Sequence, residues 1–150
     1  MTVNDGGKIC RRGAAARRWR IGTSVALFMI GLGVSEASAT GRTMEVRLKP
    51  DTPFTTLRGT IKGSDTLTYA IGAKAGQVAS ILFVPSNRSC YMNVFAPGRS
   101  DALLNGSLAG SNEFSGNLTT TGQYRVQVYL MRNAARRNEA CRHKITFEIR

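Results

Sequence analysis

Short segments in which apolar and polar residues alternate run through most of the chain, and turn signals interrupt them about every ten residues. The clearest segment covers residues 123–130, where Tyr124, Val126, Val128 and Leu130 share one parity. A period of two places successive side chains on opposite faces of a strand. We therefore expect an all-β fold, an antiparallel β-sandwich of about eight short strands.

The other expected strands lie between Gly, Pro, Ser and Asn-rich turns. They cover residues 43–49, 54–62, 66–73, 77–84, 90–96 and 142–150, and residues 101–104 form either a short edge strand or a turn. Residues 106–116 are rich in Gly, Ser and Asn and offer only Leu108 and Phe114 as anchors. The best helix candidate covers residues 133–140, with a loop as the alternative.

The first 39 residues have the composition of an export signal. Residues 1–20 carry Lys8 and five arginines against one acid, and an apolar run follows at residues 21–34. This run is too short to span a bilayer comfortably, and Ala37-Ser-Ala39 fits a small-x-small cleavage site. We expect a cleavable signal peptide at residues 1–39, one domain at residues 40–150 and a periplasmic location, with an uncleaved anchor as the alternative. Arg17-Arg18 leaves both the general secretory and the twin-arginine routes open.

Two cysteines, Cys90 and Cys141, remain after the expected cleavage. An oxidising compartment favours a disulfide between them, and two buried free thiols are the alternative. The bridge would close a loop of roughly 50 residues and stabilise the fold by about 4 kcal/mol in the chain-entropy treatment. Two cysteines and the single histidine do not supply the four ligands of a zinc site. We expect no metal and no cofactor.

No residue pattern in the chain favours catalysis. His143 lies on an expected strand with Ile145 and Phe147 at its own parity, which predicts a structural imidazole rather than a general base. There is no Gly-x-Ser-x-Gly motif, phosphate loop or dinucleotide fingerprint. The acidic residues are scattered along the sequence. We therefore expect that the protein is not an enzyme.

The expected mature segment is basic, with fifteen Lys and Arg against seven Asp and Glu and a net charge of +8. Such a charge would suit phosphates, but export separates the protein from nucleic acid. The four tyrosines do not form an evident stacking platform. We therefore expect no nucleic-acid partner and a basic solvated surface, with attraction to anionic lipopolysaccharide or peptidoglycan as an alternative.

Four sequence blocks, in order and at compatible spacing, resemble the bacterial periplasmic inhibitors of goose-type (g-type) lysozyme. The blocks are Gly59-Thr-Ile-Lys-Gly-Ser-Asp65, Thr68-Tyr69 with Ala73-Lys-Ala-Gly-Gln77, Phe95-Ala-Pro-Gly98, and Thr121-Gly-Gln-Tyr124 with Arg132-Asn-Ala-Ala-Arg-Arg137. The resemblance covers nearly all of residues 40–150. It implies an antiparallel β-sandwich, in agreement with the strand pattern.

The resemblance also implies a protein partner, a g-type lysozyme, whose substrate cleft the inhibitor blocks with a loop. The contact residues it implies are Tyr69 and Arg132, with Tyr124 and Asn133 as neighbours, and we add Gly122 and Arg136 from the same segment. A lysozyme cleft contains catalytic carboxylates, and a guanidinium can donate two hydrogen bonds to a carboxylate. A tyrosine ring supplies rigid contact area with one polar group.

Each of these residues has a structural alternative. Tyr69 would otherwise lie on the sheet surface, Tyr124 would be a core or corner tyrosine, and Arg132 and Arg136 would be solvated turn charges. A strand of about eight residues separates Tyr124 from Arg132 by roughly 25–27 Å. We therefore expect them at opposite ends of the sandwich, with Tyr69 as the companion of Arg132.

The net charge of +8 disfavours a strongly basic lysozyme as the target. It favours an acidic or neutral g-type enzyme, or a partner of another type. A carbohydrate-binding or envelope-interaction β-sandwich module without enzymatic activity is the alternative function.

Overall fold

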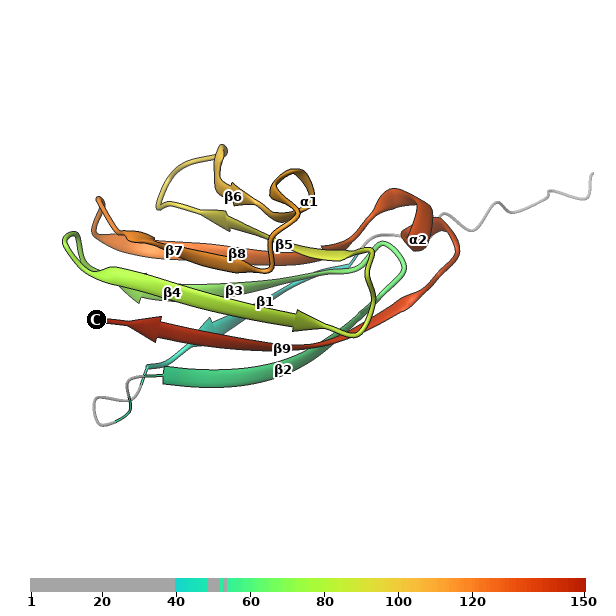
Figure 1. Cartoon of the computed structure of the whole chain (residues 1–150), viewed down its shortest axis with the longest axis horizontal. Helices are drawn as coiled ribbons and strands as arrows, with labels where there is room; N and C mark the ends of the chain where they lie inside the picture. Colours follow the sequence, from blue (N-terminus) through green and yellow to red (C-terminus); the bar gives the residue numbers. More distant parts are fainter. Residues whose placement is uncertain (1–39, 49–51, 53) are drawn as a thin grey trace, which may run out of the picture. The chain divides into compact units, whose positions relative to one another are not determined.

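Two β-sheets pack face to face in the computed structural model, which describes residues 40–48, 52 and 54–150 (Figure 1). The five-stranded sheet has the order β1 (Gly41–Val46), β3 (Thr66–Ala73), β8 (Gly122–Leu130), β5 (Cys90–Phe95) and β6 (Ala102–Asn105). The four-stranded sheet has the order β2 (Phe54–Lys62), β9 (Ala140–Ile149), β4 (Val78–Pro85) and β7 (Glu113–Asn117). The expected signal peptide and its cleavage site lie outside the described residues.

The predicted all-β sandwich is confirmed, with one difference in strand direction. Every strand pair among the described residues is antiparallel except β1 and β3, which run parallel at an edge of the five-stranded sheet. Because these two strands are parallel, no hairpin turn connects them, and the sequence contains no local signal for their pairing.

The core forms between the two sheets because strand parity directs one set of side chains inward. On β8 the inward residues are Tyr124, Val126, Val128 and Leu130, as their alternation predicts. They meet inward residues of the four-stranded sheet such as Phe83 and Phe147, which are almost fully buried. Burying this apolar surface is the main stabilising contribution to such a sandwich.

Residues 106–116 contain structure that the alternation pattern missed. A helical turn, α1 (Gly106–Ala109), is capped by the Asn105 side chain, which accepts a hydrogen bond from the Leu108 amide at 3.3 Å. The edge strand β7 follows, and its Phe114 packs against the core as expected. The prediction that Leu108 is an anchor is wrong, because its side chain is 85% exposed.

A second short helix, α2 (Arg132–Arg136), occupies the front part of the predicted helix candidate. It connects β8 to β9 at one end of the sandwich (Figure 1). Across the described part of the chain, no helix has the length and apolar character needed to cross a membrane.

Candidate functional site

The connection between β8 and β9, residues 131–139, contains three of the six predicted contact residues, Arg132, Asn133 and Arg136. We call it the α2 loop. Ala134 is fully buried and anchors the inner side of the helix. The Met131 amide donates to the Ser89 carbonyl at 2.8 Å, which fixes the start of the loop to the neighbouring turn. The outer side therefore presents Arg132, Asn133 and Arg136 to solvent, and all three are exposed.

Glu139 holds the far end of the α2 loop. Its carboxylate accepts hydrogen bonds from the Asn87 side chain at 2.8 Å and from Arg137 Nε at 2.7 Å. These two bonds hold the pKa of Glu139 below its usual value. Its carbonyl also accepts from the Gly63 amide at 2.9 Å, which ties the loop to the turn between β2 and β3.

A disulfide reinforces the same end of the sandwich. Cys90 of β5 and Cys141 of β9 are bonded, with their Cα atoms 6.3 Å apart. The predicted pairing is confirmed, and the bond joins the two sheets. Cys90 lies directly opposite Leu130, the last residue of β8 before the α2 loop. The base of the loop is therefore fixed covalently as well as by hydrogen bonds.

A groove of about 480 Å³ lies beside the α2 loop, between it, the turn at residues 63–66 and the outer faces of β5 and β8. It is lined by Gly63, Ser64, Asp65, Thr66, Asn93, Gln127, Tyr129, Leu130, Met131, Arg132 and Ala135. Within the described segments, neither Arg132 nor Asp65 forms a salt bridge. Among the described residues, the Arg132 guanidinium therefore has no charged partner, and the Asp65 carboxylate accepts a hydrogen bond from the Thr40 amide at 3.4 Å.

The predicted contact role of Tyr69 is wrong, because its side chain has no exposed surface. The ring lies in the middle of β3 and points into the core, where its hydroxyl forms a hydrogen bond with His143 Nε2 at 2.8 Å. Burial raises the pKa of Tyr69 to about 12, and the positive charge of Arg42 opposes this increase. Tyr69 is a structural residue that joins the two sheets.

Tyr124 is also structural, and its corner-tyrosine alternative is confirmed. Its side chain is 5% exposed, and its hydroxyl donates to the Thr120 carbonyl at 2.8 Å. Gly122 has a positive φ of 150°, and a Cβ there would lie 2.9 Å from Cβ of Pro97. Both residues lie at the start of β8, whereas α2 follows its end (Figure 1). The structure therefore does not bring Tyr124 or Gly122 together with Arg132. For Tyr124, this agrees with the separation expected from the length of the strand.

The groove also contains residues that are not among the predicted contact residues. Gln127 and Tyr129 occupy the outward positions of β8, between the inward positions that the alternation identified. Their outward direction could have been inferred from parity. That Asp65 and Asn93 line the same groove as Arg132 could not be inferred from the sequence. It depends on how the turn at residues 63–66 and β5 are arranged around the end of β8.

His143 is a buried core residue, 4% exposed, in agreement with the expected structural role. Burial lowers its pKa, and the backbone of Cys141 opposes this decrease in part. Its Nδ1 is buried, and no hydrogen-bond partner for it exists among the described residues. The part of the chain that the structure describes contains no group of three potential metal-ligating side chains.

The fold and the site define a class: small disulfide-bonded β-sandwiches that display exposed arginines on a short, well-anchored loop. Such a site is suited to contact with a partner surface. No family model matches the chain, but several solved structures resemble it.

One is Aeromonas hydrophila PliG, a periplasmic inhibitor of g-type lysozyme, with a TM-score of 0.69 and 31% sequence identity over 75% of this chain and 100% of that one. Salmonella Typhimurium PliG, described in the same way, has a TM-score of 0.57 and 28% identity over 74% of this chain and 100% of that one. The inhibitor of g-type lysozyme from Escherichia coli is 27% identical over 129 residues, which are 83% of this chain and 94% of that protein. The chain belongs to the family of periplasmic inhibitors of g-type lysozyme.

Proposed function

We propose that the protein binds a g-type lysozyme in the periplasm and blocks its substrate cleft with the α2 loop, in which Arg132 is the main contact. The partner is proposed because the chain belongs to the family of g-type lysozyme inhibitors. The position of Arg132, exposed and without a salt bridge among the described residues, supports its role. A lysozyme cleft offers carboxylates that a guanidinium can pair with through two hydrogen bonds.

The anchoring of the α2 loop supports tight binding. The buried Ala134, the Glu139 hydrogen bonds and the disulfide restrict the loop before any partner arrives. A loop that is already ordered loses less conformational entropy on binding. Asn133 and Arg136, exposed on the same loop, are the proposed neighbours of Arg132.

The proposal assigns no catalytic turnover to the protein. It acts by occupying the enzyme's cleft, so inhibition should be competitive with peptidoglycan. Because the protein is basic, an acidic or neutral g-type enzyme should bind faster than a strongly basic one.

An inhibition panel tests the partner. The protein should inhibit a g-type lysozyme at nanomolar to micromolar concentrations and leave a c-type lysozyme active at the same dose (affinities of about −8 to −12 kcal/mol). Equal inhibition of both enzymes, or of neither, would overturn the proposed specificity.

A carbohydrate-binding module is the second candidate, and one observation favours it. Tyr91 and Tyr129 form a tilted pair on the outer face of the five-stranded sheet, with ring centroids 6.5 Å apart. Asn93 and Gln127 lie directly opposite each other on the same face. Aromatic rings beside amides suit a sugar chain. Cosedimentation with insoluble peptidoglycan in the absence of lysozyme would support this function, and a protein that stays in the supernatant would exclude it.

A further inference from the structure

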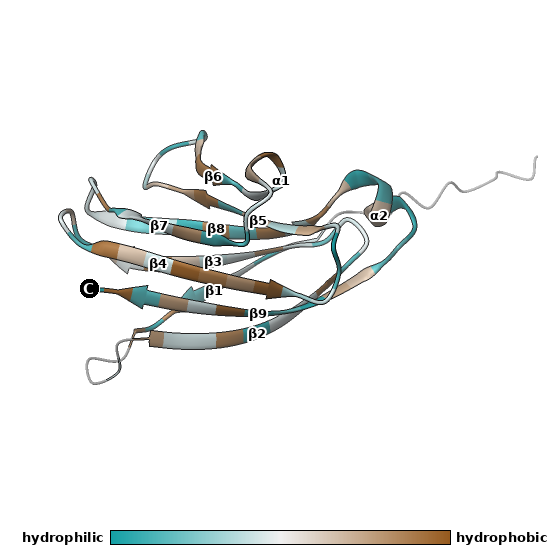
Figure 2. Ribbon diagram, viewed as in Figure 1, coloured by the Kyte–Doolittle hydropathy of each residue, from teal (hydrophilic) through white to brown (hydrophobic). Residues whose placement is uncertain are grey.

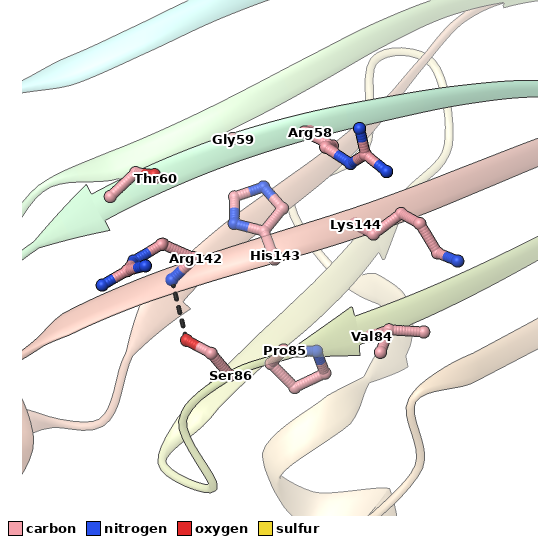
Figure 3. Close-up of a pocket in the computed structure, with 9 residues that line it drawn as sticks. All are labelled: Arg58, Gly59, Thr60, Val84, Pro85, Ser86, Arg142, His143 and Lys144. Carbon is pink, nitrogen blue, oxygen red and sulfur yellow. Dashed lines mark hydrogen bonds between the residues drawn. The ribbon is translucent and has the colours of Figure 1, made fainter.

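A groove of about 510 Å³ lies on the four-stranded sheet, whereas β5 and β8 belong to the five-stranded sheet. Figure 3 shows the side chains of Arg58, Arg142 and Lys144 around it, from β2 and β9. Lys62, the last residue of β2, is exposed at the same strand parity. We call Arg58, Lys62, Arg142 and Lys144 the cationic patch.

The cationic patch is not neutralised within the described residues. None of its four members forms a salt bridge there, and no acidic side chain lines the groove. Arg58 and Lys144 are directly opposite each other in the β2–β9 register. Like charges at directly opposed strand positions disfavour folding. A negatively charged ligand would remove this repulsion.

Exposed apolar side chains continue the same face. Val84 lies opposite Lys144, Leu82 lies opposite Thr146, and Phe54 lies opposite Glu148. Their side chains are 48%, 42% and 57% exposed, respectively. Figure 2 shows much of the β4 ribbon in the hydrophobic colour beside the more polar β9. We call Phe54, Leu82 and Val84 the apolar rim.

From this combination we propose that the outer face of the four-stranded sheet binds the phosphate-bearing surface of an anionic lipid membrane. Clustered Lys and Arg attract anionic headgroups, and neighbouring apolar side chains gain free energy when they enter the interface between headgroups and acyl chains. A soluble polyanion would use the cationic patch but would leave the apolar rim in water. The side-by-side arrangement of patch and rim therefore favours a lipid surface over a soluble polyanion.

The inference goes beyond lysozyme inhibition, because it concerns the other sheet. The groove that contains Arg132 is built on the outer face of the five-stranded sheet and on the α2 loop. A protein held to the membrane through the cationic patch would leave this groove accessible. Membrane attachment would then concentrate the inhibitor at the envelope without blocking its partner.

Cosedimentation with vesicles tests the proposal, with the full protein purified from the periplasm. Vesicles of equal parts phosphatidylglycerol and phosphatidylcholine should bind it, and pure phosphatidylcholine vesicles should not. Binding should weaken strongly at about 1 M salt, where the Debye length is about 3 Å. Equal binding to both kinds of vesicle, or to neither, would overturn the proposal.

Two double variants separate the contributions of charge and apolar surface. Arg58→Gln with Lys144→Gln should lower vesicle binding by about 30-fold, since each cation near an anionic surface contributes slightly more than about a factor of five. Leu82→Ser with Val84→Ser should also lower vesicle binding while leaving binding to a soluble polyanion such as heparin unchanged. If the serine variant binds vesicles as well as the wild type does, the face is a general polyanion site and the proposal is wrong.

Two controls keep these variants interpretable. Arg47→Gln with Lys74→Gln removes the same charge from exposed positions outside the cationic patch and should have a much smaller effect on vesicle binding. The Arg58/Lys144 variant should be at least as resistant to denaturant as the wild type, because it removes a repulsion. It should also inhibit g-type lysozyme normally, so that failure of the membrane proposal can be told apart from failure of the proposed function.

Discussion

The hydroxyl of Tyr69 and Nε2 of His143 form a 2.8 Å hydrogen bond that connects the two sheets through the core. Tyr69 belongs to β3 of the five-stranded sheet and His143 to β9 of the four-stranded sheet. The rings also meet edge to face, with centroids 5.9 Å apart. Both side chains are buried, so each polar atom depends on the other for its hydrogen bond.

Tyr69→Phe should lower the free energy of unfolding by about 1–3 kcal/mol, because it leaves the buried His143 nitrogen without a partner. Urea denaturation measures this change. Tyr129→Phe, which removes a hydroxyl from a half-buried surface tyrosine, serves as the control and should be nearly neutral. Folded Tyr69→Phe should inhibit lysozyme normally. A weaker inhibitor of unchanged stability would restore Tyr69 as a contact residue and contradict its structural role.

His143 should make stability depend on pH in the weakly acidic range. Its pKa is lowered in the folded state from the usual 6.5, so the unfolded chain binds a proton more readily. Stability should be constant well above pH 6.5 and should fall as the pH decreases through 6.5 towards the folded-state pKa. His143 is the only histidine in the chain. His143→Gln should therefore remove this slope between about pH 5.5 and 7, a range in which few other side chains titrate; an unchanged slope would assign it to other groups.

Gly59 is the residue of β2 that lies opposite His143. A Cβ at this position would lie 2.7 Å from both His143 Nε2 and the Tyr69 hydroxyl. Gly59→Ala should therefore destabilise the fold by about 1–3 kcal/mol, as overpacking does. Gly72→Ala is the matched control, because nothing lies within 4 Å of its added Cβ. Equal melting temperatures for the two variants would show that the hydrogen-bonded pair can move aside freely.

These residues show how far strand alternation predicts the structure. Tyr69 shares its parity with Leu67 and Ile71, so alternation alone indicates an inward side chain. Its hydrogen-bond partner lies 74 residues away in the sequence, and no local pattern reveals such a pair. The family resemblance implied that Tyr69 contacts the partner, but the side chain is buried in the core and cannot reach a partner surface.

The edge strand β7 could not be predicted from the alternation of apolar and polar residues. The segment of β7, Glu113–Asn117, contains one apolar residue, Phe114, and its other residues are Glu, Ser, Gly and Asn. It becomes a strand because β4 offers it backbone hydrogen bonds, which is a tertiary effect. The disulfide could be predicted because two cysteines in an oxidising compartment leave one intramolecular pairing.

Loss of the disulfide should affect stability and inhibition together. Cys90→Ala with Cys141→Ala should lower the free energy of unfolding by about 2–4 kcal/mol. Because the bond lies at the base of the α2 loop, we also expect weaker inhibition under conditions in which the variant is still folded. Denaturation and inhibition assays on the same sample measure both. Inhibition that stays at the wild-type level in a folded variant would show that the loop needs no covalent support.

The inhibition constant of Arg132→Ala against a g-type lysozyme tests the central claim most directly. Lys74→Ala, at an exposed turn at the opposite end of β8 from the α2 loop, is the matched control. We predict that Arg132→Ala weakens inhibition by about 2–5 kcal/mol, the cost of truncating one partner of a buried charge pair. The unfolding curve of this variant and the inhibition by Lys74→Ala should both remain at wild-type values. An unchanged inhibition constant for Arg132→Ala would contradict the account.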